Sequence, residues 1–142
     1  MFRACLLGLL GGVVITATSA CGSNVSTAPK VEPASTTEVW SGALTLGASR
    51  FYSFNVPLEG TVSVLLKSLT ENGAASTDQV TIGLGAPRGT DCAVSGSVVA
   101  GASDTVLLSG SQTAGVYCIR IWDNAQLTTT AAFSVNINHP KQ

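Results

Sequence analysis

The sequence predicts an all-β protein built as an antiparallel β-sandwich in the jelly-roll or Greek-key style, with about seven to eight strands. Three observations support this fold class. Apolar and polar residues alternate with a period of two in several stretches of the 142-residue chain. Residues that favour turns separate these stretches, and no window keeps the 3.6-residue period of an amphipathic helix. A small β-barrel is the alternative that the same pattern allows.

The alternation defines the expected strands in order along the chain. Successive side chains of a strand point to opposite faces, so every second residue of each run is expected to be buried. Five runs alternate clearly: residues 51–56, 62–67, 80–84, 117–122 and 133–138. Three weaker runs add to them: residues 39–46, 92–99 and 104–109. Turns are expected at Pro57–Gly60, Glu71–Gly73, Ala86–Gly89 and Asp123–Asn124.

Residues 1–20 have the features of a secretory signal peptide. Arg3 supplies a short basic start, residues 4–20 carry no charge, and the segment ends in small residues. The apolar stretch is shorter than the roughly 20 residues that a membrane-spanning helix needs. We therefore expect this segment to be removed from the mature protein.

Cys21 directly follows this segment and is the expected membrane anchor. The stretch Thr18-Ser19-Ala20-Cys21 resembles the lipobox of bacterial lipoproteins, although Leu or Val is commoner at the position of Thr18. In that family the cysteine is diacylated and becomes the mature N-terminus. The alternative is an ordinary signal peptide cleaved after Ala20, which leaves Cys21 as a free thiol. The residue after Cys21 is Gly22 and not Asp. This resembles the Gram-negative signals that direct lipoproteins to the outer membrane.

The remaining chain divides into a tether and one domain. Residues 21–37 contain the lipidated cysteine followed by a stretch rich in Ser, Thr and Pro, a composition typical of flexible, solvated linkers. Residues 38–142 are long enough for one β-sandwich domain and not for two. The expected location is therefore the bacterial cell envelope, with the domain held off the membrane by its tether.

Cys92 and Cys118 are expected to form a disulfide. The chain has four cysteines, of which Cys5 leaves with the signal peptide and Cys21 carries lipid. Two cysteines then remain in an exported, oxidising setting, where disulfides persist. A bridge closing about 27 residues would stabilise the fold by roughly 3.6 kcal/mol through loop-closure entropy. Cys118 is out of phase with the apolar residues of its strand, so we expect it on the outer face.

Titratable residues give little indication of catalysis. His139 is the only histidine and lies in a short C-terminal tail, where a solvated side chain is expected. Glu59 and Glu71 show no pattern that would pair them as glycosidase acids. Single aspartates lie near strand ends, where turn formation is the expected role and calcium binding the alternative: Asp78, Asp91, Asp104 and Asp123. We expect no metal site, no cofactor and no catalytic residue.

The partners follow from composition and from two tryptophans. Only 11% of residues are charged and the net charge is −1, which excludes the basic surface that nucleic acid requires. Trp40 and Trp122 are the candidate ligand contacts, because an exposed indole stacks on a sugar ring or anchors a protein partner. Trp122 is out of phase with the buried residues of its strand, so it is either exposed or covers the disulfide, a loop or a sheet edge.

Three stretches carry a resemblance to a known family: RFYSFNVPLEGTVSVLL, GVYCIRIWDN and AAFSVNIN. They resemble the bacterial pre-peptidase C-terminal (PPC) domain over residues 39–138, although the aspartate-rich strand common in that family is replaced here by STDQVTIGLG. The chain is also similar to small, stand-alone exported bacterial proteins that share the Tyr-Cys strand. The resemblance implies a β-sandwich without catalytic activity, a frequent accessory to secreted hydrolases.

These inferences predict a lipid-anchored envelope module with a structural or protein-interaction role. The partner is then the membrane, through the lipid, together with an envelope protein or a glycan. A carbohydrate-binding module and an accessory domain of a secreted hydrolase are the alternatives.

Overall fold

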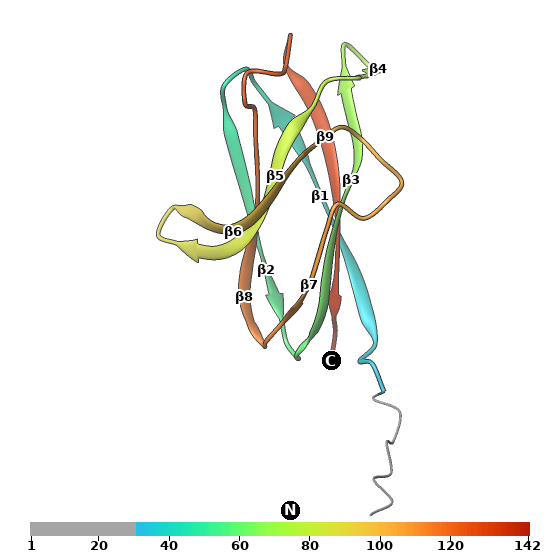
Figure 1. The fold of residues 1–142 in the computed structure, drawn as a ribbon, viewed down its shortest axis with the longest axis vertical. Helices are drawn as coiled ribbons and strands as arrows, with labels where there is room; N and C mark the ends of the chain where they lie inside the picture. Colours follow the sequence, from blue (N-terminus) through green and yellow to red (C-terminus); the bar gives the residue numbers. More distant parts are fainter. Residues whose placement is uncertain (1–30) are drawn as a thin grey trace, which may run out of the picture. The chain divides into compact units, whose positions relative to one another are not determined.

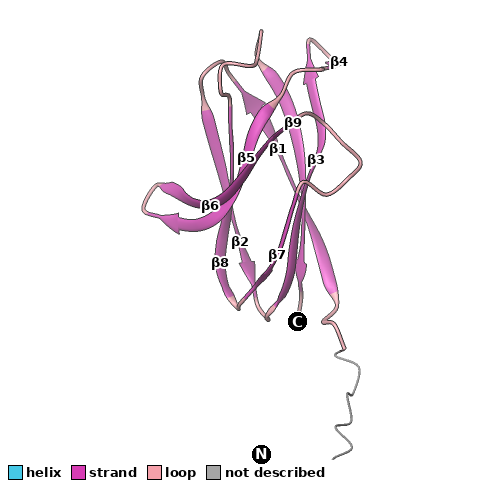
Figure 2. Cartoon of the chain, viewed as in Figure 1, coloured by secondary structure: helices cyan, strands magenta, loops and turns pink. Residues whose placement is uncertain are grey.

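The computed structural model describes residues 31–142, so the expected signal peptide and Cys21 lie outside the described residues. The described part of the chain contains nine β-strands and no helix (Figures 1 and 2). None of its elements is a helix that could cross a membrane. The strands are β1 (Ser35–Leu44), β2 (Ser49–Val56), β3 (Gly60–Glu71), β4 (Ala74–Ala75), β5 (Val80–Arg88), β6 (Asp91–Ala100), β7 (Leu108–Gln112), β8 (Gly115–Trp122) and β9 (Ala131–Pro140).

The strands form two antiparallel sheets that pack face to face. Sheet A has the order β1-β9-β3-β4, and β7 also pairs with β3. Sheet B has the order β2-β8-β5-β6. The structure therefore confirms the predicted antiparallel β-sandwich. The strand beyond the expected number is β4, a two-residue strand that pairs with the end of β3 after a tight turn. That turn places Asn72 and Gly73 at φ values of 50° and 79°, which Asn and Gly adopt most readily.

The core lies between the sheets and is built from the residues that the alternation marks as buried. Phe54 and Val56 of β2 and Ile119 and Ile121 of β8 face the buried apolar residues of sheet A. In β3 the register shifts between Leu66 and Ser68, so the buried phase moves from Leu66 to Leu69. The other fully buried core residues are Leu44, Val62, Val64, Val80, Ile82, Val135 and Ile137.

Several boundaries differ from the sequence prediction, and three of these differences affect the start of the domain, the position of β7 and one turn. β1 begins at Ser35, inside the expected tether, because residues 35–37 pair with the end of β9. β7 covers residues 108–112 and not the expected 104–109, because the preceding segment donates backbone hydrogen bonds to β3 outside a regular ladder, from Ser103 and from Leu107. The turn expected at Ala86–Gly89 lies further along, where Gly89 has a φ of 61°.

Candidate functional site

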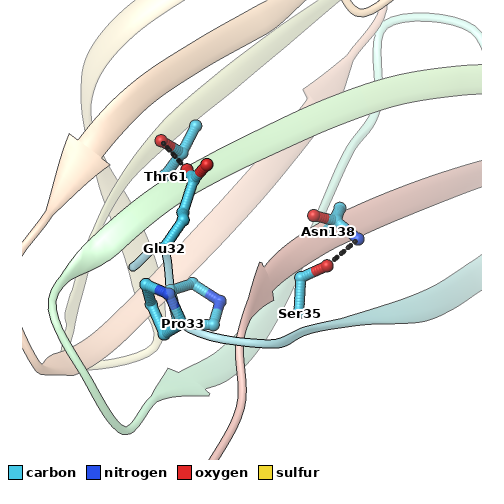
Figure 3. Close-up of a pocket in the computed structure, with 6 residues that line it drawn as sticks. Glu32, Pro33, Ser35, Thr61 and Asn138 are labelled. Atoms are coloured by element: carbon cyan, nitrogen blue, oxygen red, sulfur yellow. Dashed lines mark hydrogen bonds between the residues drawn. The ribbon is translucent and has the colours of Figure 1, made fainter. Parts of the chain in front are cut away.

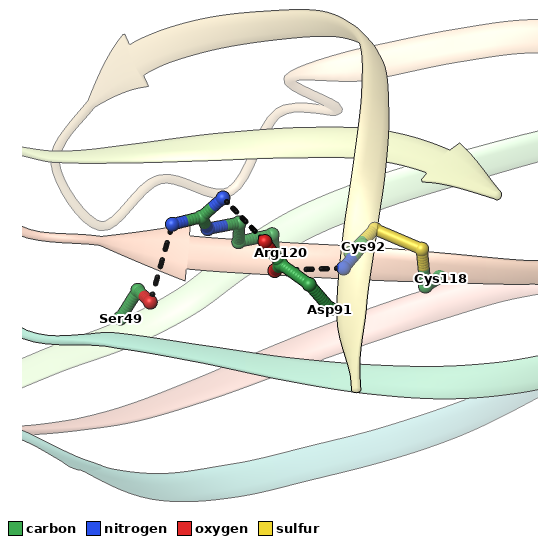
Figure 4. Close-up of polar contacts among 5 residues, drawn as sticks. All are labelled: Ser49, Asp91, Cys92, Cys118 and Arg120. Carbon is green, nitrogen blue, oxygen red and sulfur yellow. Dashed lines mark hydrogen bonds and ion pairs between the residues drawn. A yellow bond between two sulfur atoms is a disulfide. The ribbon is translucent and has the colours of Figure 1, made fainter. Parts of the chain in front are cut away.

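Cys92 and Cys118 form the predicted disulfide, with their Cα atoms 5.9 Å apart. Cys92 lies on β6 and Cys118 on β8, which are not neighbours, because β5 pairs with both strands and lies between them. The bridge forms because the start of β6 crosses over the outer face of sheet B and reaches β8 (Figure 4). The disulfide therefore fixes a strand crossing, in addition to linking two distant positions of the chain.

Two glycines of β5 make room for this crossing. A Cβ atom on Gly85 would lie 2.0 Å from the carbonyl oxygen of Ala93, and one on Gly83 would lie 2.5 Å from a methyl group of Val94. Both distances are shorter than a carbon atom can approach, so only glycine permits this approach of β6. The alternation of Gly83 and Gly85 with the apolar residues of β5 is the sequence signal that indicates a covered outer face.

The burial of Cys118 differs from the expectation. The residue does lie on the outer side of its strand, as its phase indicates, but it is fully buried. Cys92 is 2% exposed and covers it together with the rest of the crossing strand. The period-two pattern predicts the direction of a side chain correctly, but it contains no information about a strand that folds back over it.

Arg120 lies beside the disulfide and joins three elements. Its guanidinium contacts the Asp91 carboxylate at 3.5 Å and donates to the Ser49 hydroxyl at 3.3 Å (Figure 4). It also lies 5.5 Å from the centre of the Trp122 ring, within the range of a cation–π contact. Arg120 therefore links β2, β6 and β8 on the outer side of sheet B.

The two tryptophans lie in different sheets and do not share a surface. Trp122 is half-buried at the end of β8 and has the Arg120 guanidinium beside its ring. Trp40 of β1 points inward, where it stacks on Tyr52 at 5.9 Å and meets the Phe133 ring edge-on at 4.9 Å. Trp40 therefore bridges the two sheets at the edge of the core.

A pocket of about 230 Å³ opens beside Trp40 at the corner between β1 and β2. Gly42 lines the pocket, and a Cβ atom at that position would lie 3.1 Å from the Phe133 ring. Arg50 lines the pocket, and its Nε donates to the Ala43 carbonyl at 3.3 Å. Phe51, which is 40% exposed, also lines it. The pocket combines aromatic surface with a guanidinium, and the sequence indicates only its Trp40 component.

His139 is buried, in contrast to the solvated tail that we expected. It is the ninth residue of β9 and is 4% exposed. Its Nδ1 lies 2.9 Å from the Pro140 carbonyl oxygen and its Nε2 lies 2.9 Å from Glu38 Oε1. The Tyr52 hydroxyl donates to the other oxygen of Glu38 over 2.6 Å, and this hydrogen bond raises the pKa of Tyr52. The three side chains connect β9, β1 and β2, and both nitrogens of the imidazole are already engaged.

A second cavity of about 270 Å³ lies where the chain enters the domain, between the start of β1 and the end of β9. Its walls combine polar side chains with the apolar rings of Pro33 and Pro140 (Figure 3). Thr61 donates to Glu32 Oε1 at 3.3 Å, and Asn138 donates to the Ser35 hydroxyl at 3.4 Å. These contacts attach residues just before β1 to the sandwich.

The aspartates take structural positions. Asp123 accepts backbone hydrogen bonds from Gly47, Gln126 and Leu127, and the bond from Gly47 is the main reason that its pKa is lowered. Asp104 pairs with Lys67 on the surface, which lowers the pKa of Asp104. The others contact neighbouring groups: Asp78 accepts from the Thr128 backbone and Asp91 from the Cys92 backbone.

No group of three or more metal-ligating side chains converges within residues 31–142. Glu59 precedes β3 and Glu71 ends it, so the twelve-residue strand separates them. The structure therefore does not pair Glu59 with Glu71 in the way that glycosidases pair their two carboxylates.

No protein-family description and no curated protein matches the chain. Among solved structures, the chain is similar to one from the Bacillus endospore appendages, described as a novel family of disulfide-linked pili. The identity is 18%, the alignment covers 84% of this chain and 100% of that chain, and the TM-score is 0.41. A similarity of this degree carries no functional information, and the resemblance to the PPC family stays a prediction.

Proposed function

We propose that the chain is a lipid-anchored, non-catalytic module of the bacterial cell envelope, with a structural or protein-interaction role. The observation that carries the proposal is the buried Cys92–Cys118 disulfide, which holds β6 across sheet B. Structural disulfides of this kind form and persist in exported proteins. The lipobox-like residues before Cys21 supply the membrane attachment.

The geometry of the polar residues supports a role without catalysis. Both ring nitrogens of His139 lie within hydrogen-bond distance of fixed protein oxygens, so neither nitrogen is free to contact a substrate. Asp123 and Arg120 are likewise bound to neighbouring backbone or side chains. Assays of the purified protein against ester, peptide and glycoside substrates should show no turnover. A turnover that survives purification and disappears in His139→Ala would overturn this part of the proposal.

The membrane attachment is tested by replacing Cys21 with Ser. The variant should leave the membrane fraction and appear in the soluble exported fraction, since it cannot be acylated. Cys5→Ser is the matched control, because it removes a cysteine from the segment that is cleaved off and should fractionate as the wild type does. An unmodified mature N-terminus in mass spectrometry, or membrane retention of Cys21→Ser, would contradict the anchor.

A second candidate function, binding of a saccharide, is favoured by the pocket beside Trp40. Aromatic surface and a guanidinium at one opening suit a sugar ring with an anionic substituent. On a glycan array, Arg50→Ala should lose a signal that the wild type shows, whereas Trp122→Ala, which leaves this pocket intact, should keep it. Absence of any wild-type signal would exclude this candidate.

A further inference from the structure

β1 forms one long edge of sheet A. It pairs along all ten residues with β9, and within residues 31–142 no strand pairs with its other side. The opposite edge of the sheet is divided between β7, with five residues, and β4, with two. An edge strand presents a row of N–H and C=O groups on which another strand can pair.

The hydrogen-bonding phase of β1 shows which backbone groups face outward. Lys141 donates its backbone N–H to the Ala34 carbonyl over 2.8 Å, so residue 34 directs its backbone groups toward β9. Because antiparallel strands alternate, the even-numbered residues of β1 do the same and the odd-numbered ones direct their groups away from β9. The bond from Arg50 Nε to the Ala43 carbonyl agrees with this phase and occupies that end of the edge. The outward-facing backbone groups that stay free therefore lie at residues 35, 37, 39 and 41.

The side chains along this stretch do not protect it. The edge strands of natural sheets are commonly protected by Lys, Pro or a β-bulge. Residues 35–44 contain no Lys and no Pro, and their pairing with β9 shows no bulge. The odd-numbered side chains are small and uncharged, and Val39 is 64% exposed. The one charged residue of the strand, Glu38, is bound to His139 and Tyr52.

We propose that the free edge of β1 pairs antiparallel with β1 of a second copy of this chain, about a two-fold axis at Val39. In this register Val39 faces its own counterpart and Thr37 faces Ser41 of the other copy, so the exposed valines cover one another without opposing like charges. The partner in the interaction role proposed above is then a second copy of the chain. The proposal rests on that role and does not depend on the lipid anchor.

The oligomeric state in solution tests the pairing. Sedimentation equilibrium is measured over a wide range of concentration on the full chain carrying Cys21→Ser, with any free thiol alkylated, so that neither lipid nor a new disulfide can link two copies. The mass should rise to twice that of the monomer.

Val39→Lys and Val39→Pro should both remain monomeric. The proline should leave the pairing with β9 intact, because the N–H that it removes faces away from that strand. Val116→Lys is the matched control, with the same change at a valine of 56% exposure on β8, and should dimerise as the parent does.

Two results would overturn the proposal. The first is a parent chain that stays monomeric at every concentration. This result overturns the proposal even if the monomer binds an extended peptide of another sequence. The second is Val39→Lys or Val39→Pro that dimerises as strongly as the parent, which would place the contact elsewhere. Circular dichroism of each variant confirms that it is folded, and Val39→Lys decides the question if the proline variant is not. Failure of the membrane-fractionation test would leave these outcomes unchanged, so the two proposals fail separately.

Discussion

At the scale of single residues, the most informative polar groups of this domain hold the backbone in place. Asp123 is 7% exposed and accepts backbone hydrogen bonds from the loop before β2 and from the loop after β8. His139 joins two strands of one sheet to a strand of the other through Glu38 and Tyr52. Each therefore makes a specific contribution to the free energy of unfolding.

Asp123→Asn should destabilise the domain at neutral pH by about 1–3 kcal/mol, the range for hydrogen bonds to a charged group. The pKa of Asp123 is lowered from its ordinary value of 3.8, so its contribution is fully present above that pH and is lost as the pH falls through the lowered value. Urea unfolding at pH 7 and in acid should therefore show a difference between wild type and variant that shrinks in acid. An equal difference at both pH values would contradict this role of the charge.

His139→Ala should cost about 1–3 kcal/mol, because it leaves Glu38 Oε1 without its partner and removes the packing of the imidazole against Phe54 at 5.5 Å. Lys67→Ala is the control for the loss of one ion pair. Its partner Asp104 has an 87% exposed side chain, so that change should shift the urea midpoint much less than His139→Ala does. Urea midpoints compare the two variants. A similar small shift in both would show that the buried network contributes nothing beyond a surface pair.

At the scale of elements, the crossing of β6 over sheet B depends on glycine. Gly85→Ala places a methyl group against the Ala93 backbone, so the hairpin must move and the domain should lose at least about 1–3 kcal/mol. Gly96→Ala, on the same hairpin, meets nothing within 4 Å and should change the urea midpoint little. Mass mapping should also show incomplete Cys92–Cys118 pairing in Gly85→Ala alone. Equal stability and equal pairing in both variants would refute the steric argument.

The same elements show how far the sequence predicts this fold. Tyr52, Phe54 and Val56 alternate cleanly, and in the structure Phe54 and Val56 are buried and Tyr52 is half-buried, because a strand with one buried face needs only that local signal. The phase of β9 continues from Phe133 to His139, so the burial of the histidine was readable, but its position in the tail suggested solvent instead. The crossing of β6 and the pocket beside Trp40 depend on contacts between strands that are distant in the sequence. The sequence indicates such contacts only through glycines such as Gly83 and Gly85.

At the scale of the whole molecule, the Cys92–Cys118 disulfide stabilises the β-sandwich. Replacing both Cys92 and Cys118 with Ala should destabilise the domain by roughly 3–4 kcal/mol, since the bridge restricts the unfolded chain. The double replacement avoids a lone thiol and is measured by urea unfolding in the absence of reductant. A loss below about 1 kcal/mol would mean that the packing of β6 alone holds the crossing.

The bridge also closes a ring of covalent bonds that runs from Cys92 on sheet B, through β7 on sheet A, and back to Cys118 on sheet B. Residues 101–107, between β6 and β7, include exposed side chains such as Val106. A protease that cuts there would therefore open the ring without releasing a fragment. The nicked chain should migrate as one species on a non-reducing gel and as two after reduction. Two fragments without reductant would mean that the ring had not been closed. A copy of this protein that is cut in this loop would thus stay in one piece for as long as the disulfide remains oxidised.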